Sequence, residues 1–382
     1  MIDRFFFKVI CLVLVCNAGL FQVMAQTNRS TIRSGELWPD DKGVHVNAHG
    51  GGMLYYQGKY YWFGEFKSKT TSSALVGVTC YSSKDLCNWT NNGIALKVVE
   101  NDAKSDITKG CIIERPKVVY NEKMKQFVMW FHLELKGKGY SAARIGTAVS
   151  DRVEGPYRFV RSFRPNPNVW PQNMSKEQKE LKLNIADYSE WWTPEWRKSV
   201  NNGLFVQRDM KDGQMSRDMT IFVDDDGKAY HIYSSEENLT MQIAELTDDY
   251  LSHTGKYIRL APGGHNEAPS IFKKDGTYWL ITSGCTGWDP NEARMFSSPS
   301  IWGPWIQHPN PCVGEGAKLT FGAQSTYIQK VEGLKDAYIF MADRWTPKNP
   351  IDARYVWLPI QFENNRPVLK WLDEWNLSIF EK

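Results

Sequence analysis

The fold is decided by the stretch Gln57-Gly58-Lys59-Tyr60-Tyr61-Trp62-Phe63-Gly64, a tight turn followed by an aromatic-rich strand. The same order of short strand, polar turn and aromatic strand recurs in four later segments, whose second strands are 126–131, 228–233, 277–282 and 336–341. Aromatic and β-branched residues on both sides of such turns are typical of β-hairpins. Repeats of about 50 residues with three or four strands each are typical of propeller blades. The sequence therefore predicts an all-β fold, a five-bladed β-propeller, with a β-sandwich as the alternative.

The composition favours a folded protein that handles sugars over one that binds nucleic acid. The 382 residues include 16 Trp, 17 Tyr and 18 Phe, and the formal net charge is only +3. So small a positive charge gives no reason to expect a nucleic-acid partner. Flat aromatic rings cover the apolar faces of sugars, although the same surplus could serve cross-strand aromatic pairs in the sheets.

The amino-terminal segment has the pattern of an export signal. Residues 1–8 carry two basic side chains, residues 9–21 are nearly all apolar, and small residues precede Ala25. This order is typical of a signal peptide, and the apolar run is too short for a stable membrane span. We expect a signal peptide over 1–25, a catalytic domain over 26–382, and a secreted or periplasmic protein. Lipid attachment at Cys16 stays open.

The sequence shows no motif for a metal or an organic cofactor. The cysteines beyond residue 25 are odd in number and lack zinc-site spacing, and a phosphate-binding glycine loop is absent. We therefore expect no metal among the site residues and no required cofactor. A structural calcium or sodium ion in the channel is compatible with the sequence.

When the five repeats are aligned on their turns, each has a polar residue at the same position. Counting back nine residues from each turn gives His49, Glu114, Asp218, Glu267 and Gln324. Each begins the innermost strand of its blade, so we expect the five side chains to meet around the axis at one end. Charged groups that converge cost solvation energy, which favours a functional site over a purely structural one. The alternative is a metal or water cluster that plugs the channel.

An insertion interrupts the repeats between blades two and three, at about 162–214. A helix is expected over 175–185, opened by Ser175 with Gln178 three residues later, and the aromatic run 191–196 follows. Its length is unusual for a compact domain. It is either a lid or pocket wall, or a surface excursion that packs its own aromatic residues.

Three carboxylates and an amide around one pocket suit the hydrolysis of a glycosidic bond. One carboxylic acid protonates the leaving oxygen, and a second group activates water or attacks directly. Neighbouring carboxylates raise the pKa of the acid, so that it holds a proton near neutral pH.

Two motifs, Arg217-Asp218-Met219 and Asn266-Glu267-Ala268-Pro269, resemble glycoside hydrolase family 43, a family of five-bladed inverting glycosidases. Its exo-β-1,3-galactanase branch is the most similar, in 48–52, 61–65, 113–116, 286–288 and Gln324. The resemblance covers the chain from about Trp38 to its end, except the insertion.

The resemblance implies Glu267 as general acid and Asp218 as the residue that tunes and orients it. Most of the family has an aspartate base in blade one, where this chain has His49-Gly50-Gly51. The galactanase branch also lacks it, and Gln324 is the implied substitute. A neutral amide is a poor base, so Glu114 is held as the rival. The positions expected to hold the sugar are His49, Glu65, Tyr140, Asn238, Thr286, Gly287 and Trp288.

The expected function is an exo-acting, inverting hydrolase that releases galactose from the non-reducing end of β-1,3-galactan, the arabinogalactan backbone. The alternatives are an α-L-arabinofuranosidase or β-xylosidase of the same fold, or a non-catalytic carbohydrate-binding propeller.

Overall fold

The structure, a computed structural model, describes residues 28–287 and 289–381. The expected signal peptide over 1–25, with Cys16, lies outside the described residues, and so does Trp288. Within the described ranges, no helix combines the length and apolar character needed to cross a bilayer.

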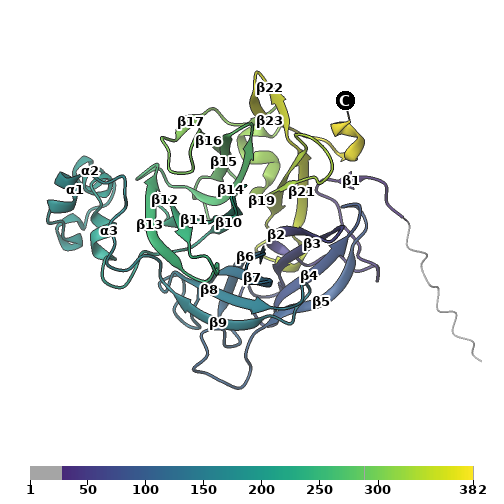
Figure 1. Ribbon diagram of the computed structural model, residues 1–382, viewed down its shortest axis with the longest axis horizontal. Helices are drawn as coiled ribbons and strands as arrows, with labels where there is room; N and C mark the ends of the chain where they lie inside the picture. The colour runs from purple at the N-terminus through teal and green to yellow at the C-terminus, as the bar shows by residue number, and fades with distance from the viewer. Residues whose placement is uncertain (1–27, 288, 382) are drawn as a thin grey trace, which may run out of the picture.

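Antiparallel sheets surround a common axis (Figure 1). Four sheets each contain four consecutive strands. The first contains β2 (His49–Tyr56), β3 (Lys59–Glu65), β4 (Gly77–Ser83) and β5 (Thr90–Lys97). The second contains β6 (Ile112–Asn121), β7 (Gln126–Glu134), β8 (Arg144–Ser150) and β9 (Arg158–Phe163). The third contains β10 (Met219–Val223), β11 (Ala229–Ser235), β12 (Thr240–Leu246) and β13 (His253–Leu260). The fourth contains β14 (Glu267–Lys274), β15 (Thr277–Ser283), β16 (Arg294–Ser298) and β17 (Ile306–His308).

Two further sheets have three strands each. One contains β19 (Gln324–Lys330), β20 (Tyr338–Arg344) and β21 (Arg354–Pro359). The other contains β18 (Cys312–Val313), β23 (Arg366–Lys370) and β22 (Gln361–Glu363). A two-stranded pair joins β1 (Ile32–Arg33) to β24 (Glu374–Trp375), and short 3-10 helices occur at η2 (Ala317–Gly322), η3 (Pro350–Asp352) and η4 (Leu377–Phe380).

The all-β propeller is confirmed, but the prediction of five blades is wrong, because the described chain has six sheets of three or more strands. The inner strands β2, β6, β10, β14 and β19 contact one another in a closed ring around the axis. The unpredicted sheet, β18-β23-β22, lies against β21 at the rim (Figure 1). Its strands β18 and β23 pair in parallel from distant parts of the chain. A search for local hairpin repeats cannot detect such a pairing.

The hairpin turns form where the sequence predicts them. Gln57 and Gly58 both have positive φ, 48° and 80°, which is the geometry of the two-residue turn that matches strand twist. Asp275 and Gly276 repeat it with φ of 48° and 76°. These turns set the register of β2 on β3 and of β14 on β15.

Three inner strands carry the same β-bulge at the axis. The register shifts between His49 and Gly52 in β2, and likewise from Glu114 to Lys117 in β6 and from Glu267 to Ser270 in β14. In each case three residues advance against two on the partner strand, which is the extra residue of a bulge. The residue after the first member has positive φ in all three: Gly50 58°, Arg115 55° and Ala268 53°.

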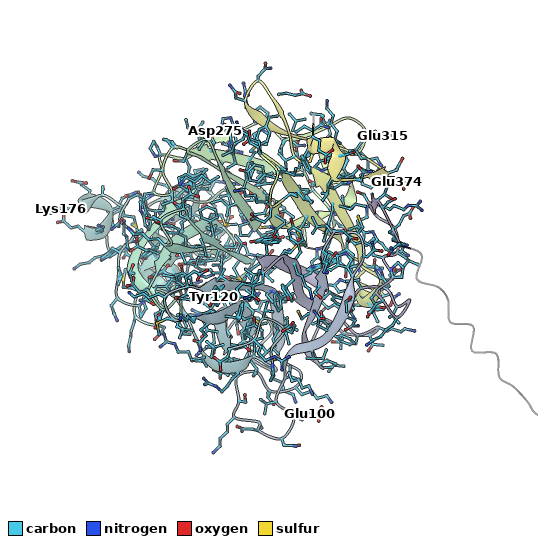
Figure 2. The ribbon with its side chains drawn as sticks, turned by 45° about the vertical axis from the view of Figure 1, so that its right-hand side comes forward. Glu100, Tyr120, Lys176, Asp275, Glu315 and Glu374 are labelled. Carbon is cyan, nitrogen blue, oxygen red and sulfur yellow. The ribbon has the colours of Figure 1, made fainter. Side chains whose placement is uncertain are left out.

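Much of the aromatic surplus lies in the core, where it packs blade against blade. At the closure of the ring, Trp62 lies 4.5 Å from Tyr355 and Trp38 lies 4.7 Å from Trp357, measured between ring centroids. Figure 2 shows side chains filling the spaces between the sheets. The five cysteines of the described residues are all free thiols.

The insertion between β9 and β10 holds α1 (Lys176–Glu180), η1 (Ile185–Tyr188), α2 (Pro194–Asn201) and α3 (Leu204–Arg208). Ser175 and Gln178 form the expected capping box, but α1 ends at Glu180 instead of 185, because Leu181 is extended. The helices stand at the edge of the propeller beside β13, as Lys176 shows in Figure 2. Arg259 of β13 holds them by donating hydrogen bonds to the carbonyl oxygens of Val200 and Asn201.

Candidate active site

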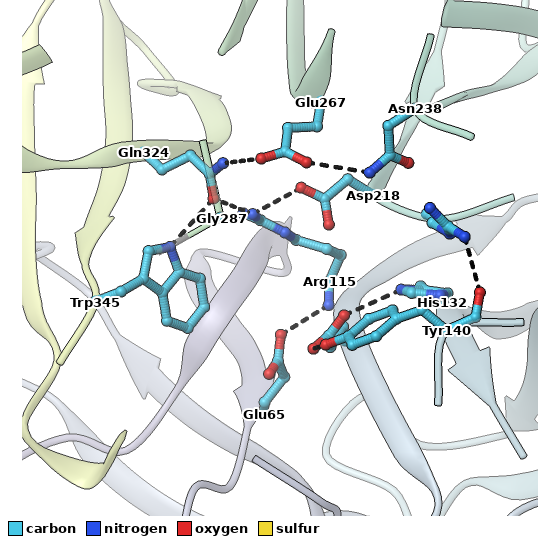
Figure 3. A pocket seen from close by; sticks show the side chains of 12 residues that line it. Glu65, Arg115, His132, Tyr140, Asp218, Asn238, Glu267, Gly287, Gln324 and Trp345 are labelled. Atoms are coloured by element: carbon cyan, nitrogen blue, oxygen red, sulfur yellow. Dashed lines mark hydrogen bonds and ion pairs between the residues drawn. The ribbon is translucent and has the colours of Figure 1, made fainter. Parts of the chain in front are cut away.

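The inner strands enclose a pocket of about 350 Å³ at the end of the axis where they begin. This volume is in the range of small-molecule sites. The pocket is lined by Glu65, Glu114, Arg115, His132, Tyr140, Arg217, Asp218, Asn238, Glu267, Gly287, Gln324 and Trp345. Figure 3 shows Arg115 between Glu267 on one side and Glu65 on the other.

The structure brings together most of the residues predicted from the sequence. The residues that line the pocket include the four candidate catalytic residues and Glu65, Tyr140, Asn238 and Gly287. His49 is not among them: it is buried against the ring of Trp345, and burial lowers its pKa well below the usual value, so it is neutral. Thr286 is also outside the lining, and its hydroxyl donates a hydrogen bond to the carbonyl oxygen of Asp289.

Glu267, the first residue of β14, is the carboxyl group best suited to hold a proton. Burial, and after it the charge of Asp218, raises its pKa to about 7. Its two oxygens accept hydrogen bonds from amide groups, at 3.0 Å from Gln324 Nε2 and 3.3 Å from Asn238 Nδ2. The group is therefore oriented and half-protonated near neutral pH, as a general acid requires.

Asp218 is tied to the acid through the backbone. Its Oδ2 accepts a hydrogen bond of 3.1 Å from the backbone N–H of Ala268, the residue that follows Glu267. The same oxygen forms an ion pair of 2.8 Å with the guanidinium of Arg115. Asp218 thus both places a negative charge near the acid and anchors the strand that carries it.

Arg115 and Trp345 determine how the amide of Gln324 is oriented. Its Oε1 accepts hydrogen bonds from Arg115 at 2.5 Å and from Trp345 Nε1 at 3.1 Å, while its Nε2 donates to Glu267 and to Ser283. To act as a base, the amide of Gln324 would have to take its imidic acid form, which carries a proton on the oxygen, but two donors already point at this oxygen. The contacts therefore favour the ordinary amide form of Gln324.

Glu114 belongs to a buried chain of charges, Glu134–His132–Glu114. His132 bridges the carboxylates, with Nδ1 3.1 Å from Glu114 and Nε2 3.0 Å from Glu134, and Tyr140 donates to Glu114 at 2.7 Å. Burial alone would lower the pKa of His132, but the two carboxylates raise it to about 9. Burial would raise the pKa of Glu114, but the hydrogen bond and charge of His132 outweigh the effect of burial and lower this pKa to about 2. Glu114 is therefore an ionised hydroxyl acceptor of low basicity.

Glu65 forms the opposite wall, at the end of β3. Its carboxylate accepts a hydrogen bond of 2.9 Å from the backbone N–H of Arg115 and pairs with Lys67 at 2.5 Å. Gly50 is required beside it, because a Cβ there would lie 2.3 Å from Glu65 Oε1. The glycine after His49 thus makes room for this carboxylate.

Sequence reasoning missed four of the residues that line the pocket: Arg115, His132, Arg217 and Trp345. Arg115 and Arg217 stand inside the quoted motifs, directly beside Glu114 and Asp218, so their proximity was visible. His132 lies opposite Glu114 on the second strand of its hairpin, and pairing the hairpin would have identified it. Trp345 follows β20 and carries no sequence signal of its own.

One group of described residues has the composition of a metal site. Ligand atoms of Glu114, His132 and Asp218 lie within 4.8 Å of one another. In this arrangement the raised pKa of His132 keeps its ring protonated, and Arg115 pairs with Asp218. A metal bound to this group would have to displace the proton of His132 and compete with Arg115 for Asp218.

Comparisons with known proteins agree with this site. The family model for glycosyl hydrolases family 43 matches residues 195–348. A solved β-1,3-galactosidase of that family, bound to galactodeoxynojirimycin, is 60% identical with a TM-score of 0.89, over 91% of this chain and 100% of that one. The exo-β-1,3-galactanase of Phanerochaete chrysosporium, solved with β-1,3-galactotriose, is 31% identical with a TM-score of 0.72, over 91% of this chain and 68% of that one.

A further solved structure and a curated protein extend the comparison. The exo-β-1,3-galactanase of Clostridium thermocellum is 34% identical with a TM-score of 0.72, over 91% of this chain and 66% of that one. A β-D-galactofuranosidase of Aspergillus niger is 29% identical over 99 residues, which are 25% of this chain and 28% of that protein. The pocket, the family model and the identity to a solved member over its full length lead to one conclusion: the chain belongs to glycoside hydrolase family 43.

Proposed function

We propose that this glycoside hydrolase removes single galactose units from the non-reducing end of β-1,3-galactan, with inversion of configuration. The observation that carries the proposal is Glu267, a carboxyl group with a pKa raised to about 7 in a pocket of hydroxyl-binding groups. The 60% identical β-1,3-galactosidase supports galactose as the sugar. The enclosure of the pocket by the ring of inner strands supports an exo mode, because a chain end can enter it more readily than a chain middle.

In the proposed reaction Glu267 gives its proton to the glycosidic oxygen as the bond to C1 breaks. Water attacks C1 from the opposite face and loses a proton to a base, which yields the inverted anomer. Asn238 and Gln324 hold the carboxyl group of Glu267 through their amides. Glu65 and Glu114 face the sugar as ionisable acceptors for its hydroxyl groups.

Gln324 and Glu114 are the two candidates for the base, and one observation counts against each of them. Gln324 touches the acid at 3.0 Å, whereas acid and base of an inverting enzyme stand about 6.5–9.5 Å apart across the sugar. Glu114 has a pKa lowered to about 2. Azide rescue distinguishes them: the alanine variant that regains turnover with azide and forms galactosyl azide has lost the base.

Two expectations from the sequence stay proposals. We propose that the chain is exported after cleavage near Ala25, which puts the enzyme outside the cytoplasm with its polymer. We propose also that hydrolysis needs no cofactor, since an acid and a base suffice for this reaction. Mass spectrometry of the mature protein and activity after dialysis against a chelator test the two proposals.

Product analysis by NMR on β-1,3-galactobiose tests the function, with wild type beside Glu267→Gln. We expect α-galactose first from wild type, and a loss of 10²–10⁴-fold in the variant, the range typical of a general acid. The control is Glu100→Gln, in an exposed surface ion pair with Lys109. Early β-galactose would contradict inversion, and release of arabinose or xylose from other substrates in place of galactose would change the assigned sugar.

A further inference from the structure

Two tryptophans of the insertion are exposed at its surface. Trp191 and Trp192 have exposed fractions of 41% and 46%. The ring of Trp191 stacks on Trp196, with 5.1 Å between centroids and 29° between planes. Trp196 is itself only 1% exposed, and the buried ring of Phe205 lies 5.7 Å from that of Trp191, so the 41% exposure of Trp191 is what these two neighbours leave uncovered.

The backbone holds Trp192 in an unfavourable conformation. Its φ is 74°, in the left-handed region where a bulky side chain is rare. Arg197 lies 5.3 Å from its ring and donates a hydrogen bond to its carbonyl oxygen at 3.3 Å. Strain of this kind persists where the surroundings enforce it, and it concentrates at functional sites.

The exposed pair is joined to the wall of the active site. The ring of Trp192 lies 4.9 Å from that of His265, which precedes Glu267 by two residues. Two residues separate Cα atoms by at most about 7.6 Å. The backbone N–H of His265 donates to the carbonyl oxygen of Leu239, the residue after Asn238 of the pocket.

A chain of ion pairs provides a second connection between insertion and pocket. Arg208 of α3 pairs with Glu237 at 2.8 Å, and Glu237 pairs with Arg217 of the pocket at 3.0 Å. Arg217 in turn donates to the carbonyl oxygen of Tyr140 at 2.9 Å. The insertion is therefore held at the rim by contacts to the pocket wall, although none of its own residues lines the pocket.

We propose that Trp191 and Trp192 form an aromatic platform that binds galactan units on the leaving-group side, beyond those nearest the cleaved bond. The inference rests on the proposed function, because an exo enzyme leaves the rest of its polymer outside the pocket. The axial hydroxyl at C4 leaves galactose an apolar C–H face, which stacks on exposed indole rings. Exposed aromatic rings supply a large contact area, and exposed apolar patches mark surfaces that bind a ligand or partner.

Chain-length dependence tests the platform. We compare kcat/KM on β-1,3-galactobiose and β-1,3-galactohexaose for wild type and for Trp191→Ala combined with Trp192→Ala. The platform predicts a loss of about tenfold on the hexaose and a change below twofold on the biose. Tyr55→Ala is the matched control, an aromatic residue of β2 that is 37% exposed. Equal losses on both substrates, or no loss on either, would overturn the platform.

Radical footprinting of the Glu267→Gln enzyme supplies a second test, in which both tryptophans stay in place. Oxidation of Trp191 and Trp192 should fall at least threefold with bound hexaose in the Glu267→Gln enzyme, and should not fall with galactobiose. If wild type hydrolyses galactobiose but hexaose does not protect the two tryptophans, the platform is refuted and the proposed function is not. Failure of wild type to cleave either substrate would count against the proposed function, while the footprint still tests binding.

Discussion

Asp218→Asn removes the charge of this side chain and nearly keeps its shape, and the pKa of Glu267 should change as a result. Asp218→Asn keeps an oxygen that can accept the hydrogen bond from Ala268, which lies 3.1 Å away in the wild type. The variant also leaves the guanidinium of Arg115 without its partner at 2.8 Å. Both changes make the ionised form of Glu267 more favourable, so we expect its pKa to fall.

The size of the effect follows from the pKa of Glu267. It is raised from 4.5 to about 7, which corresponds to about 3.4 kcal/mol at 1.36 kcal/mol for each pH unit. Burial contributes most of it and Asp218 comes second, so we assign about one pH unit to the charge of Asp218. At pH 7 the protonated fraction of Glu267 then falls from about one half to about one tenth, a fivefold loss of active enzyme.

The assay is the pH dependence of kcat/KM on β-1,3-galactobiose, whose alkaline limb reports the acid of the free enzyme. We expect the limb near pH 7 in wild type, because Glu267 must be protonated, and near pH 6 in Asp218→Asn. Asp225→Asn, at an 87% exposed carboxylate of a hairpin turn, should leave the limb unchanged. A limb that stays in place or moves to higher pH in Asp218→Asn would refute the electrostatic role.

Three further predictions concern stability. The pKa of His132 is raised to about 9, so its stabilisation is complete below pH 6.5 and lost as pH rises through 9. The calorimetric midpoint of wild type should therefore fall over that window relative to that of His132→Gln, a difference that removes the opposite effect of Lys117, whose pKa burial lowers to about 7. Gly50→Ala places a Cβ 2.3 Å from Glu65 Oε1 at a φ of 58°, and urea unfolding should show a loss of about 1–3 kcal/mol, whereas unchanged stability would mean that the bulge of β2 relaxes freely. Arg259→Met leaves the buried Glu236 unpaired, at a cost of about 3–5 kcal/mol that a second change, Glu236→Gln, should partly restore.

Local patterns allowed the sequence to predict the hairpins and the ring of inner strands. A turn such as Gln57-Gly58 sets the register of its own two strands, so each repeat could be aligned without knowledge of its neighbours. That alignment brought Glu114, Asp218, Glu267 and Gln324 into one pocket. Elements that depend on distant pairing could not be found this way, and the sheet that contains β18 and β23 is the clearest case.

The site residues that were missed act through side-chain reach, which a register count does not contain. Arg115 extends across the axis to Asp218 and to Gln324 on two other blades. His49 fails for the opposite reason: it occupies the same position in its strand as Glu114, but its ring packs between Trp345 and Tyr355. Equal register therefore predicts the place of a residue in the ring and not the direction of its side chain.

The shared bulge of β2, β6 and β14 has a consequence for how this catalytic centre can change. In each strand the additional residue and the positive φ at Gly50, Arg115 and Ala268 give the backbone its shape, whatever side chain stands before them. The backbone therefore has the same shape at His49, Glu114 and Glu267, and each of these positions can carry a different side chain without changing that shape. A propeller built this way can gain, lose or relocate a carboxylate among its blades while its chain path stays the same, so the reaction can diverge faster than the fold.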